Sequence, residues 1–582
     1  MLRFSILWSV TVLFGCAAEP SSVPDHPNVL LVLTDDQGYG DLSLHGNDSI
    51  DTPNLDRLGR ESVRFERFYV SPVCAPTRAS LLTGRYHHRT GVSWVTHRKE
   101  VMRSEETTLA ELLREYGYRT GIFGKWHNGE QYPNDPTGQG FDEFWGFSAG
   151  HWNNYFNTTL THNRRSVQTQ GYLPDYLTDR VLDFIQEDKT QPWFCYVPYP
   201  TPHTPVQVPD AYFNKYQQRG LSDYNAGIYG MVENIDDNVG RLLAALEASG
   251  QAKNTIVLFL TDNGPNGNRY NGGMRGAKAS VHEGGVRVPL FVRYPNGGLV
   301  ARTVYDYTMH IDLLPTVAVL CGVSALPGEL DGRNMLPALR GEASLPERPL
   351  FTFPIGSEVH PEPGAVRTPR YRYILNRAGE DELYDMSLDS AQTHDLAAQL
   401  PEETAAFRQQ YLDKFAEVTA NYTGIPPIPV TLRTPSVWLP APEAELIGGP
   451  KFSAHWGWAN DWIVNWTQPT DTIRWHLDVH EPGTYAVELH YTATKAQMGV
   501  EISVATERET ISVAALEAFV PEVVPSPDRS LRKEVYEQTW GKQRLGVVRL
   551  NASTRSISLV ARRSPAGQVA VKGILLEPMS TN

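Results

Sequence analysis

Cysteine and positive charge are both scarce in this chain. Its 582 residues include four cysteines, too few for a disulfide-rich scaffold. Lysine and arginine total 52 against 66 aspartate and glutamate, which leaves a formal net charge of −14. This acidic balance argues against a nucleic-acid-binding protein, so an anion-binding pocket must concentrate its cations locally. A hydrophobic content of 41% with 20% charged residues is typical of a folded globular chain.

Long hydrophobic runs are also lacking. The apolar run from Phe4 to Phe14 follows Arg3 and is too short for a membrane span of about 20 residues. Residues 1–16 are therefore predicted to be an export signal. Leu13-Phe14-Gly15-Cys16 resembles a bacterial lipoprotein box, which implies lipidation of Cys16; an ordinary cleaved signal is the alternative. We expect an exported protein, periplasmic or anchored to the outer membrane, that meets the membrane only through a lipid anchor.

Strand-like and helical patterns alternate over residues 25–345. Val29–Leu33 and Thr255–Leu260 are short apolar runs with β-branched residues, typical of strands buried on both faces. Between them, apolar residues recur at helical spacing from Ile228 to Leu246, and Gly250 follows as a stop. The alternation predicts an α/β sandwich with a central, mostly parallel sheet flanked by helices.

The pattern changes after residue 345. Residues 346–425 are predicted to form a smaller α+β subdomain, and the proline-rich residues 426–450 a linker. Residues 451–582 alternate apolar and polar residues, as in Thr484–Tyr491, and predict an appended antiparallel β-sandwich. Several tryptophans near its start make this domain a candidate carbohydrate-binding module.

Polar oxygen ligands follow the two predicted strands. Asp35 and Asp36 come after the first strand, and Asp262 and Asn263 after the second. Parallel sheets place sites at the carboxyl ends of their strands. Each pair alone is equally well explained as a turn or a helix cap. Together, with no cysteine or histidine in either pair, they suit calcium or magnesium, between which the sequence does not choose.

A cysteine is predicted to begin a helix in Cys74-Ala75-Pro76-Thr77-Arg78, which continues to Thr83-Gly84. Proline suits a first helical turn and glycine suits a helix end. Free N–H groups at a helix N-terminus favour an anion, and Arg78 lies one turn further on. A cysteine in this position is expected to have unusual reactivity.

This string resembles the Cys-x-Pro-x-Arg and Thr-Gly signature of the formylglycine-dependent (type I) sulfatases in the alkaline-phosphatase superfamily. The resemblance extends over residues 28–420. It implies that a formylglycine-generating or anaerobic sulfatase-maturating enzyme oxidises Cys74 to formylglycine. It also implies one Ca²⁺, with Mg²⁺ as the alternative. The implied metal ligands are Asp35, Asp36, Asp262, Asn263 and an oxygen of the modified Cys74.

Three further motifs match the family in the expected order: Gly124-Lys125-Trp126-His127, Pro202-His203-Thr204-Pro205 and Arg275-Gly276-Ala277-Lys278. The resemblance implies that Arg78 and the two lysines neutralise the sulfate. His203 or Lys278 protonates the leaving oxygen, and His127 removes a proton from hydrated formylglycine. The predicted catalytic residues are Cys74, Arg78, Lys125, His127, His203 and Lys278.

The sequence identifies the substrate less clearly than the catalytic residues. His151 and Trp152 are predicted to bind it, because aromatic rings and amides around residues 151–156 suit a sugar, although buried packing explains the rings equally well. Arg367 is predicted as a further contact, because the resemblance implies that the smaller region, in which it lies, closes over the pocket. Export and the appended domain favour a sulfated polysaccharide or oligosaccharide, first a marine algal one. The alternatives are a glycosaminoglycan or aryl sulfatase, a phosphatase or phosphonate hydrolase of the same superfamily, and a non-catalytic lipid-anchored glycan-binding protein.

Overall fold

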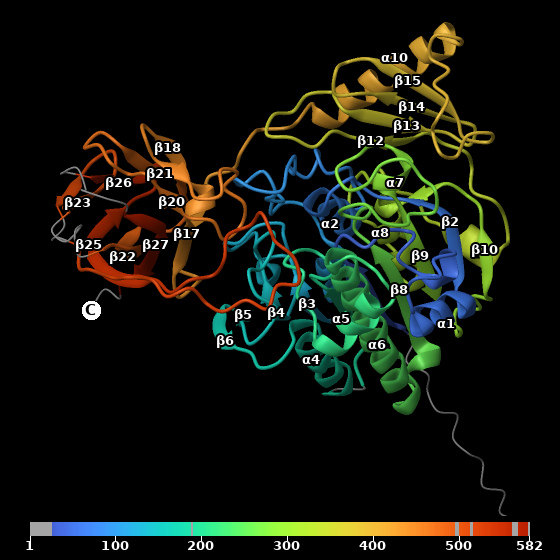
Figure 1. The fold of residues 1–582 in the computed structure, drawn as a ribbon, viewed down its shortest axis with the longest axis horizontal. Helices are drawn as coiled ribbons and strands as arrows, with labels where there is room; N and C mark the ends of the chain where they lie inside the picture. The colour runs from blue at the N-terminus through green and yellow to red at the C-terminus, as the bar shows by residue number, and fades with distance from the viewer. Residues whose placement is uncertain (1–25, 188–189, 495–499, 513–515, 562–568, 580–582) are drawn as a thin grey trace, which may run out of the picture.

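The computed structural model describes residues 26–187, 190–494, 500–512, 516–561 and 569–579. The predicted export signal over residues 1–16, with Cys16, lies outside them. Figure 1 shows a large helix-and-strand block, a small sheet with one long helix, and a separate group of strands at the C-terminal end. Among the described residues, none of the helices combines the length and the apolar character needed to cross a bilayer.

An eleven-stranded sheet organises the large block, in the order β10-β2-β9-β8-β1-β7-β3-β4-β5-β6, with β11 beside β2. Its centre is parallel, because β1 pairs in parallel with β7 and β8, and β3 with β7 and β4. The predicted fold class is confirmed. The strands are β1 Asn28–Thr34, β2 Val63–Tyr69, β3 Arg119–Lys125, β4 Glu143–Phe147, β5 Thr159–His162, β6 Arg165–Gln168, β7 Trp193–Pro198, β8 Thr255–Thr261, β9 Arg287–Arg293, β10 Arg302–Val304 and β11 Thr308–Met309.

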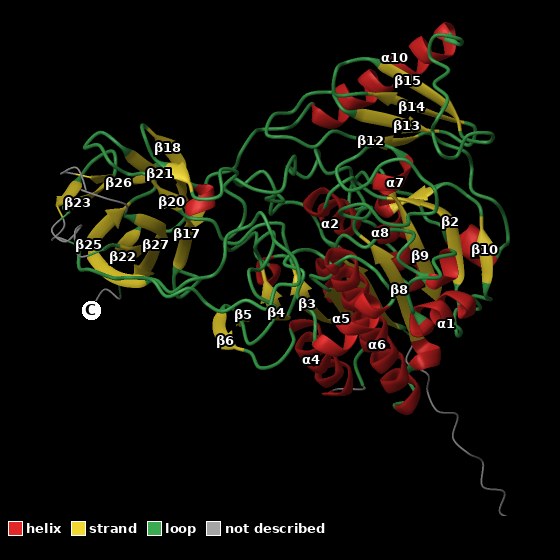
Figure 2. Ribbon diagram, in the orientation of Figure 1, coloured by secondary structure: helices red, strands yellow, loops and turns green. Residues whose placement is uncertain are grey.

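Side-chain alternation along β1 builds a core on each face of this sheet. Leu31 packs into one hydrophobic cluster and its neighbour Leu30 into the other. Each fully buried side chain of this size contributes about 1.5–3 kcal/mol of transfer free energy. The first cluster includes residues of α2 Cys74–Thr83, α3 Leu109–Glu115, α8 Leu313–Leu320 and α9 Leu336–Arg340. The second includes residues of α1 Pro53–Glu61, α4 Leu173–Glu187, α5 Asp210–Gln218 and α6 Asp223–Ala248, of which α4, α5 and α6 are grouped together in Figure 2.

The long helix α6 follows from its sequence. Ser222 caps it by accepting a hydrogen bond from the backbone N–H of Asn225. Its apolar residues, Ile228 to Leu246, are buried against the sheet. Gly250 follows with φ of 74°, a left-handed conformation that glycine adopts without strain. The short helix α7, Glu283–Val286, comes directly before β9.

A second, antiparallel sheet follows the large block, in the order β12-β13-β14-β15. Its strands are β12 Leu350–Thr352, β13 Gly364–Arg367, β14 Tyr371–Leu375 and β15 Asp381–Asp385, and the helix beside it is α10 Pro401–Thr419. Tyr411 of α10 packs with Tyr373 and Leu383 of the sheet. This arrangement is the expected α+β subdomain.

The C-terminal part forms two six-stranded sheets, in the orders β16-β21-β26-β23-β24 with β18, and β19-β20-β27-β22-β25 with β17. Both contribute to one hydrophobic cluster, so the predicted β-sandwich is present. The strands are β16 Ile428–Val430, β17 Val437–Pro440, β18 Glu445–Ile447, β19 Lys451–Phe452, β20 Ile463–Val464, β21 Thr472–Val479, β22 Gly483–Thr492, β23 Ile502–Ala505, β24 Thr510–Ser512, β25 Gly541–Leu550, β26 Ser556–Ala561 and β27 Ala570–Pro578.

The prediction of a linker over residues 426–450 is wrong. This segment supplies β16 and β18, which pair with β21, and β17, which pairs with β27. Its prolines suggested a linker, but Pro429 lies on an edge strand, where a missing N–H is tolerated. Val437 and Leu439 are buried in the sandwich core. The sandwich therefore begins near residue 428.

Candidate active site

The predicted metal ligands meet at one edge of the central sheet. β1 ends at Thr34 and is followed by Asp35 and Asp36, while the neighbouring β8 ends at Thr261 and is followed by Asp262 and Asn263. Because the two strands are parallel and in register, their carboxyl ends bring these side chains together. The backbone N–H of Asp36 donates to Asp262 Oδ1 at 3.2 Å, which ties the two turns to each other.

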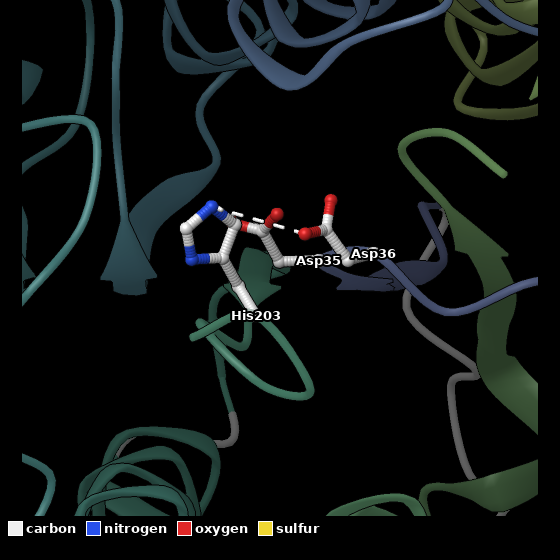
Figure 3. A group of neighbouring side chains, drawn as sticks. All are labelled: Asp35, Asp36 and His203. Carbon is white, nitrogen blue, oxygen red and sulfur yellow. Dashed lines mark ion pairs between the residues drawn. The ribbon is translucent and has the colours of Figure 1, made fainter. Parts of the chain in front are cut away.

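Two overlapping groups of candidate ligand atoms share Asp35. One ligand atom each from Asp35, Cys74 and Asp262 lies within 4.8 Å of the others, and the same holds for Asp35, Asp36 and His203. Figure 3 shows the His203 ring facing the two carboxylates, with Nε2 3.8 Å from Asp36 Oδ2. Among the described residues, these are the groups of His, Cys, Asp and Glu that satisfy this spacing. They form a single site.

The buried oxygens of this site fit a hard cation. Asp35 Oδ1, Asp36 Oδ2 and Asn263 Oδ1 are buried and have no hydrogen-bond partner among the residues that the structure describes. A buried polar atom without a hydrogen bond costs about 1–3 kcal/mol of stability. A cluster of such oxygens therefore indicates a binding site for a ligand. Carboxylate and amide oxygens are the donors that Ca²⁺ and Mg²⁺ prefer. The residues present therefore fit the divalent cation that the family resemblance implies.

Position 74 begins helix α2, with Val73 before it in extended conformation and Gly84 after the helix in left-handed conformation. The Cys74 side chain is buried. Burial raises the pKa of its thiol, and the neighbouring Lys125 and Lys278 do not outweigh that effect. An unmodified Cys74 is therefore a protonated thiol rather than an activated thiolate. Cys195 and Cys321 are free, buried thiols.

Arg78 ties the site to the helix that carries Cys74. Its Nη2 donates to Asp262 Oδ2 at 2.8 Å and lies 3.3 Å from Asp35 Oδ2, and its Nη1 donates to the Lys125 carbonyl at 2.8 Å. Burial alone would raise the pKa of Asp35, but Lys125, His203 and Arg78 hold it well below its ordinary value. Burial and the nearby Asp35 raise the pKa of Asp262 to about 7. The neighbouring cations therefore stabilise the charge of Asp35 more than that of Asp262.

Two lysines reach the acidic cluster from different parts of the chain. Lys125, the last residue of β3, places its Nζ 2.5 Å from Asp35 Oδ2. Lys278 Nζ lies 2.6 Å from Asp36 Oδ1. Burial alone would lower the pKa of Lys278, but Asp36 raises it above its ordinary value. Lys278 is therefore a cation at neutral pH, available to an incoming anion.

The two predicted catalytic histidines have opposite ring orientations. His127 Nε2 lies 2.9 Å from the Val95 carbonyl and must carry the proton, while its buried Nδ1 has no partner. Burial and Lys125 lower the pKa of His127 well below its ordinary value. In His203 it is Nδ1 that donates, to the Thr204 carbonyl at 2.7 Å, and burial and Lys278 lower its pKa. The structure gathers all predicted catalytic and metal residues in one site, while their roles stay predictions.

The three residues predicted to contact the substrate do not lie together in the structure. His151 belongs to the site, because its ring lies parallel to that of His203 at a centroid distance of 6.2 Å. Trp152 instead stacks on Phe147 and lines a separate cavity of about 310 Å³ that contains none of the predicted catalytic residues. Its aromatic character is explained by packing.

Arg367 is also engaged elsewhere. It is 5% exposed, donates from Nε to Tyr69 Oη at 3.2 Å and pairs with Glu283 Oε2 at 3.6 Å. Arg372 Nη1 pairs with the same carboxylate atom at 2.9 Å. These contacts join α7 to the small antiparallel sheet. They give Arg367 a structural role in place of the predicted substrate contact.

Sequence reasoning missed a contribution from the C-terminal sandwich. Glu534 accepts a hydrogen bond from Thr204 Oγ1 at 2.7 Å and also interacts electrostatically with His151 and His203. Arg532 donates from Nη1 to the Asn153 carbonyl at 2.5 Å. No motif marked either residue. The sequence feature that could have indicated this contribution is the long stretch between β24 and β25, which carries several charged residues.

Several known proteins are similar to this chain in sequence. The family model described as "Sulfatase" matches residues 27–323, and the one described as "N-sulphoglucosamine sulphohydrolase, C-terminal" matches residues 277–420. N-acetylgalactosamine-6-sulfatase of Canis lupus familiaris is 33% identical over 387 residues, which covers 59% of this chain and 71% of that protein. Steryl-sulfatase of Mus musculus is 32% identical over 434 residues, with 57% and 68% covered.

A solved structure agrees. The crystal structure of Ps i-CgsB in complex with k-i-k-neocarrahexaose has a TM-score of 0.63 and 28% sequence identity, and the alignment covers 69% of this chain and 95% of that one. The resemblance inferred from the motifs around Cys74 is confirmed. The chain belongs to the sulfatase family, and it is a sulfuric ester hydrolase.

Proposed function

We propose that this sulfatase removes sulfate ester groups from a sulfated carbohydrate, using formylglycine formed at Cys74 and one bound Ca²⁺. The observation that carries the proposal is the buried cluster in which Cys74, Asp35 and Asp262 approach within 4.8 Å. Arg78, Lys125 and Lys278 surround it. An acidic protein that concentrates three cations around one small site is built to hold an anion there.

Each protein group has a task that its surroundings support. When present, hydrated formylglycine supplies a nucleophilic oxygen and the divalent cation supplies positive charge beside the sulfate. Lys125 and Lys278 orient and neutralise sulfuryl oxygens, and Arg78 holds the carboxylates in place. His127 is neutral with a free Nδ1, so it can accept a proton.

Protonation of the leaving oxygen falls to His203 or Lys278. His203 directs Nε2 toward the acidic cluster, and its Nδ1 is hydrogen-bonded to the Thr204 carbonyl. Lys278 is a stable cation against Asp36. Both groups lie near Asp36, on the same part of the cluster. The leaving-group dependence of His203 and Lys278 variants separates the two roles.

A carbohydrate substrate is supported by the similar proteins. One is named for a sulfated amino sugar, and another was solved with a neocarrahexaose. We propose a marine algal polysaccharide or its oligosaccharides as the substrate, with glycosaminoglycans and aryl sulfates as the alternatives. Sulfate release from carrageenan oligosaccharides, glycosaminoglycan disaccharides and 4-nitrophenyl sulfate tests this. Release from the aryl ester alone would contradict a carbohydrate substrate.

The modification is tested by mass spectrometry of the peptide that contains Cys74. Conversion of a thiol to an aldehyde lowers its mass by about 18 Da. We expect this loss only when a formylglycine-generating or anaerobic sulfatase-maturating enzyme is co-expressed. Full activity of a protein with an unmodified Cys74 would refute the mechanism. Preference for a phosphate over the matching sulfate ester would instead favour the phosphatase alternative.

We also propose that the protein is exported and lipidated at Cys16. The support is the sequence of the first residues, Arg3 and the apolar run that ends before Cys16. Labelling of growing cells with a clickable fatty acid tests it. Label on the wild type and none on Cys16→Ala is expected; equal label on both would contradict lipidation at this residue.

A further inference from the structure

Residues 519–540 leave the β-sandwich between β24 and β25 and lie against the catalytic block. In Figure 1 an orange-red loop reaches from the sandwich toward β3 and β4. Arg529 donates from its backbone N–H to the Val206 carbonyl at 2.8 Å and from Nη2 to the Val208 carbonyl at 2.9 Å. Gln207 Nε2 donates to Asp528 Oδ1 at 2.7 Å. The segment is therefore docked on the loop that follows His203.

The same segment holds the loop that carries His151. Arg532 Nη1 donates to the Asn153 carbonyl at 2.5 Å, and Asn153 Nδ2 donates to Glu537 Oε2 at 3.1 Å. The Arg532 side chain is 1% exposed and stacks on Tyr536, with Cζ 4.2 Å from the ring centroid. An arginine this deeply buried has a fixed position. The contact between the domains is thus built around the active-site loops.

Glu534 lies at the centre of this contact. It accepts a hydrogen bond from Thr204 Oγ1 at 2.7 Å. Thr204 is the residue whose backbone carbonyl accepts the proton of His203 Nδ1 at 2.7 Å. Tyr155 Oη donates to the same carbonyl at 3.2 Å. The carboxylate of Glu534 and the phenol of Tyr155 therefore hold the residue that orients the His203 ring.

We propose that the sandwich segment 519–540 is part of the active site, and that Glu534 is a positioning residue that acts on His203 through Thr204. The inference rests on the proposed function and extends it, because it assigns a catalytic task to the appended domain. Of the two candidates, His203 is taken here as the proton donor, so its Nε2 must point at the leaving oxygen and its ring orientation depends on the Thr204 carbonyl. Loosening that residue displaces the proton donor without removing it. Small misplacements of a catalytic group cost roughly 10- to 100-fold in rate.

The test compares variants of the full-length, matured enzyme on two sulfate esters. A sugar or alkyl sulfate has a poor leaving group and needs protonation, whereas 4-nitrophenyl sulfate has a good one and needs it little. Glu534→Ala is expected to lower kcat on the sugar or alkyl ester by roughly 10- to 100-fold and on the aryl ester by less than about 3-fold. His203→Ala should show the same dependence on the leaving group.

Conservative variants separate positioning from folding. Glu534→Gln keeps an oxygen acceptor for Thr204 and should recover most of the activity, as should Thr204→Ser, whereas Thr204→Val should resemble Glu534→Ala. Glu522→Ala changes an exposed glutamate of the same segment and should match the wild type. If Glu534→Ala fails to fold, the comparison of Thr204→Val with Thr204→Ser decides.

The inference is overturned if Glu534→Ala and Thr204→Val keep the wild-type kcat on the sugar or alkyl ester. It is also overturned if they lose activity equally on both esters or change KM alone. A wild-type enzyme inactive on every sulfate ester would instead refute the proposed function, so the two failures are distinguishable.

Discussion

Arg78 Nη2 lies 2.8 Å from Asp262 Oδ2, and neither side chain has exposed surface. A buried ion pair repays its desolvation only when its geometry is good, and removing one partner leaves an uncompensated charge. Helix α2 and strand β8 are joined by this pair, so it links the position of Cys74 to the metal-ligating turns. The pair therefore serves both stability and catalysis.

Replacement of Arg78 should destabilise the fold. For Arg78→Ala we expect a loss of about 3–5 kcal/mol in the free energy of unfolding, because Asp262 and Asp35 lose their buried partner. Denaturant unfolding of the metal-free protein measures this. Arg60→Ala removes an exposed partner of Asp56, which keeps its hydrogen bonds from Ser43 and Thr52, and should cost less than about 1 kcal/mol. Equal effects of the two substitutions would contradict the role assigned to Arg78.

Replacement of Cys74 should abolish activity and leave the fold intact. Cys74→Ala removes one buried sulfur and should lower the free energy of unfolding by about 1 kcal/mol, yet sulfate release should fall to background. Cys195→Ala is the matched control, since that thiol is equally buried but lies within β7. The control should keep its activity. Sulfate release by Cys74→Ala above background would count against position 74 as the source of the nucleophile.

Removal of the metal should lower stability as well as activity. Asp35 Oδ1, Asp36 Oδ2 and Asn263 Oδ1 lack protein partners, so the folded chain should bind Ca²⁺ and the unfolded chain should not. Calcium at about 100 times its Kd then adds about 2.7 kcal/mol to the free energy of unfolding. Thermal unfolding after chelation and after calcium addition measures this.

Asn263→Ala should weaken that calcium response, while Asp48→Asn, an exposed acidic residue, should leave it unchanged. Recovery of stability and activity with zinc alone would contradict an all-oxygen site.

Acid should destabilise the protein partly through His87. Burial lowers the pKa of this ring to about 4, whereas the unfolded chain titrates near 6.5. Between these values the unfolded state binds the proton more readily, so the free energy of unfolding falls as pH falls. The contribution between pH 7 and pH 5 is about 2 kcal/mol.

His87→Asn should reduce that pH dependence, because the asparagine amide does not titrate. The amide can still donate to the Val92 carbonyl, which accepts a hydrogen bond from the ring Nδ1 of His87. His360→Asn, at an exposed position, should not change it. An unchanged slope in His87→Asn would show that this ring does not titrate on unfolding.

The catalytic centre was predictable because its residues follow directly from local sequence. Asp35 and Asp262 come immediately after apolar strands, and Cys74 is the first residue of a helix with a proline in its first turn, so strand ends and a helix start place them. Arg367 failed as a substrate contact because its partner, Glu283, lies far away in the sequence. No local pattern reveals such a pair.

The C-terminal boundary failed for a related reason. Prolines in residues 426–450 indicated a linker, but edge strands tolerate proline, and the pairing of β17 with β27 spans most of the domain. Glu534 was not predictable at all, because its role depends on how two domains dock. Contacts of that kind leave no periodicity in either segment.

The early strands β16, β17 and β18 have a practical consequence for gene engineering. A fragment that starts at residue 451, where the composition changes, would lack three edge strands and leave β21 and β27 with unsatisfied backbone groups along their outer sides. Exposed sheet edges pair with strands of other molecules, so the fragment would tend to aggregate into inclusion bodies. A swap or fusion of the accessory module is better cut ahead of Ile428.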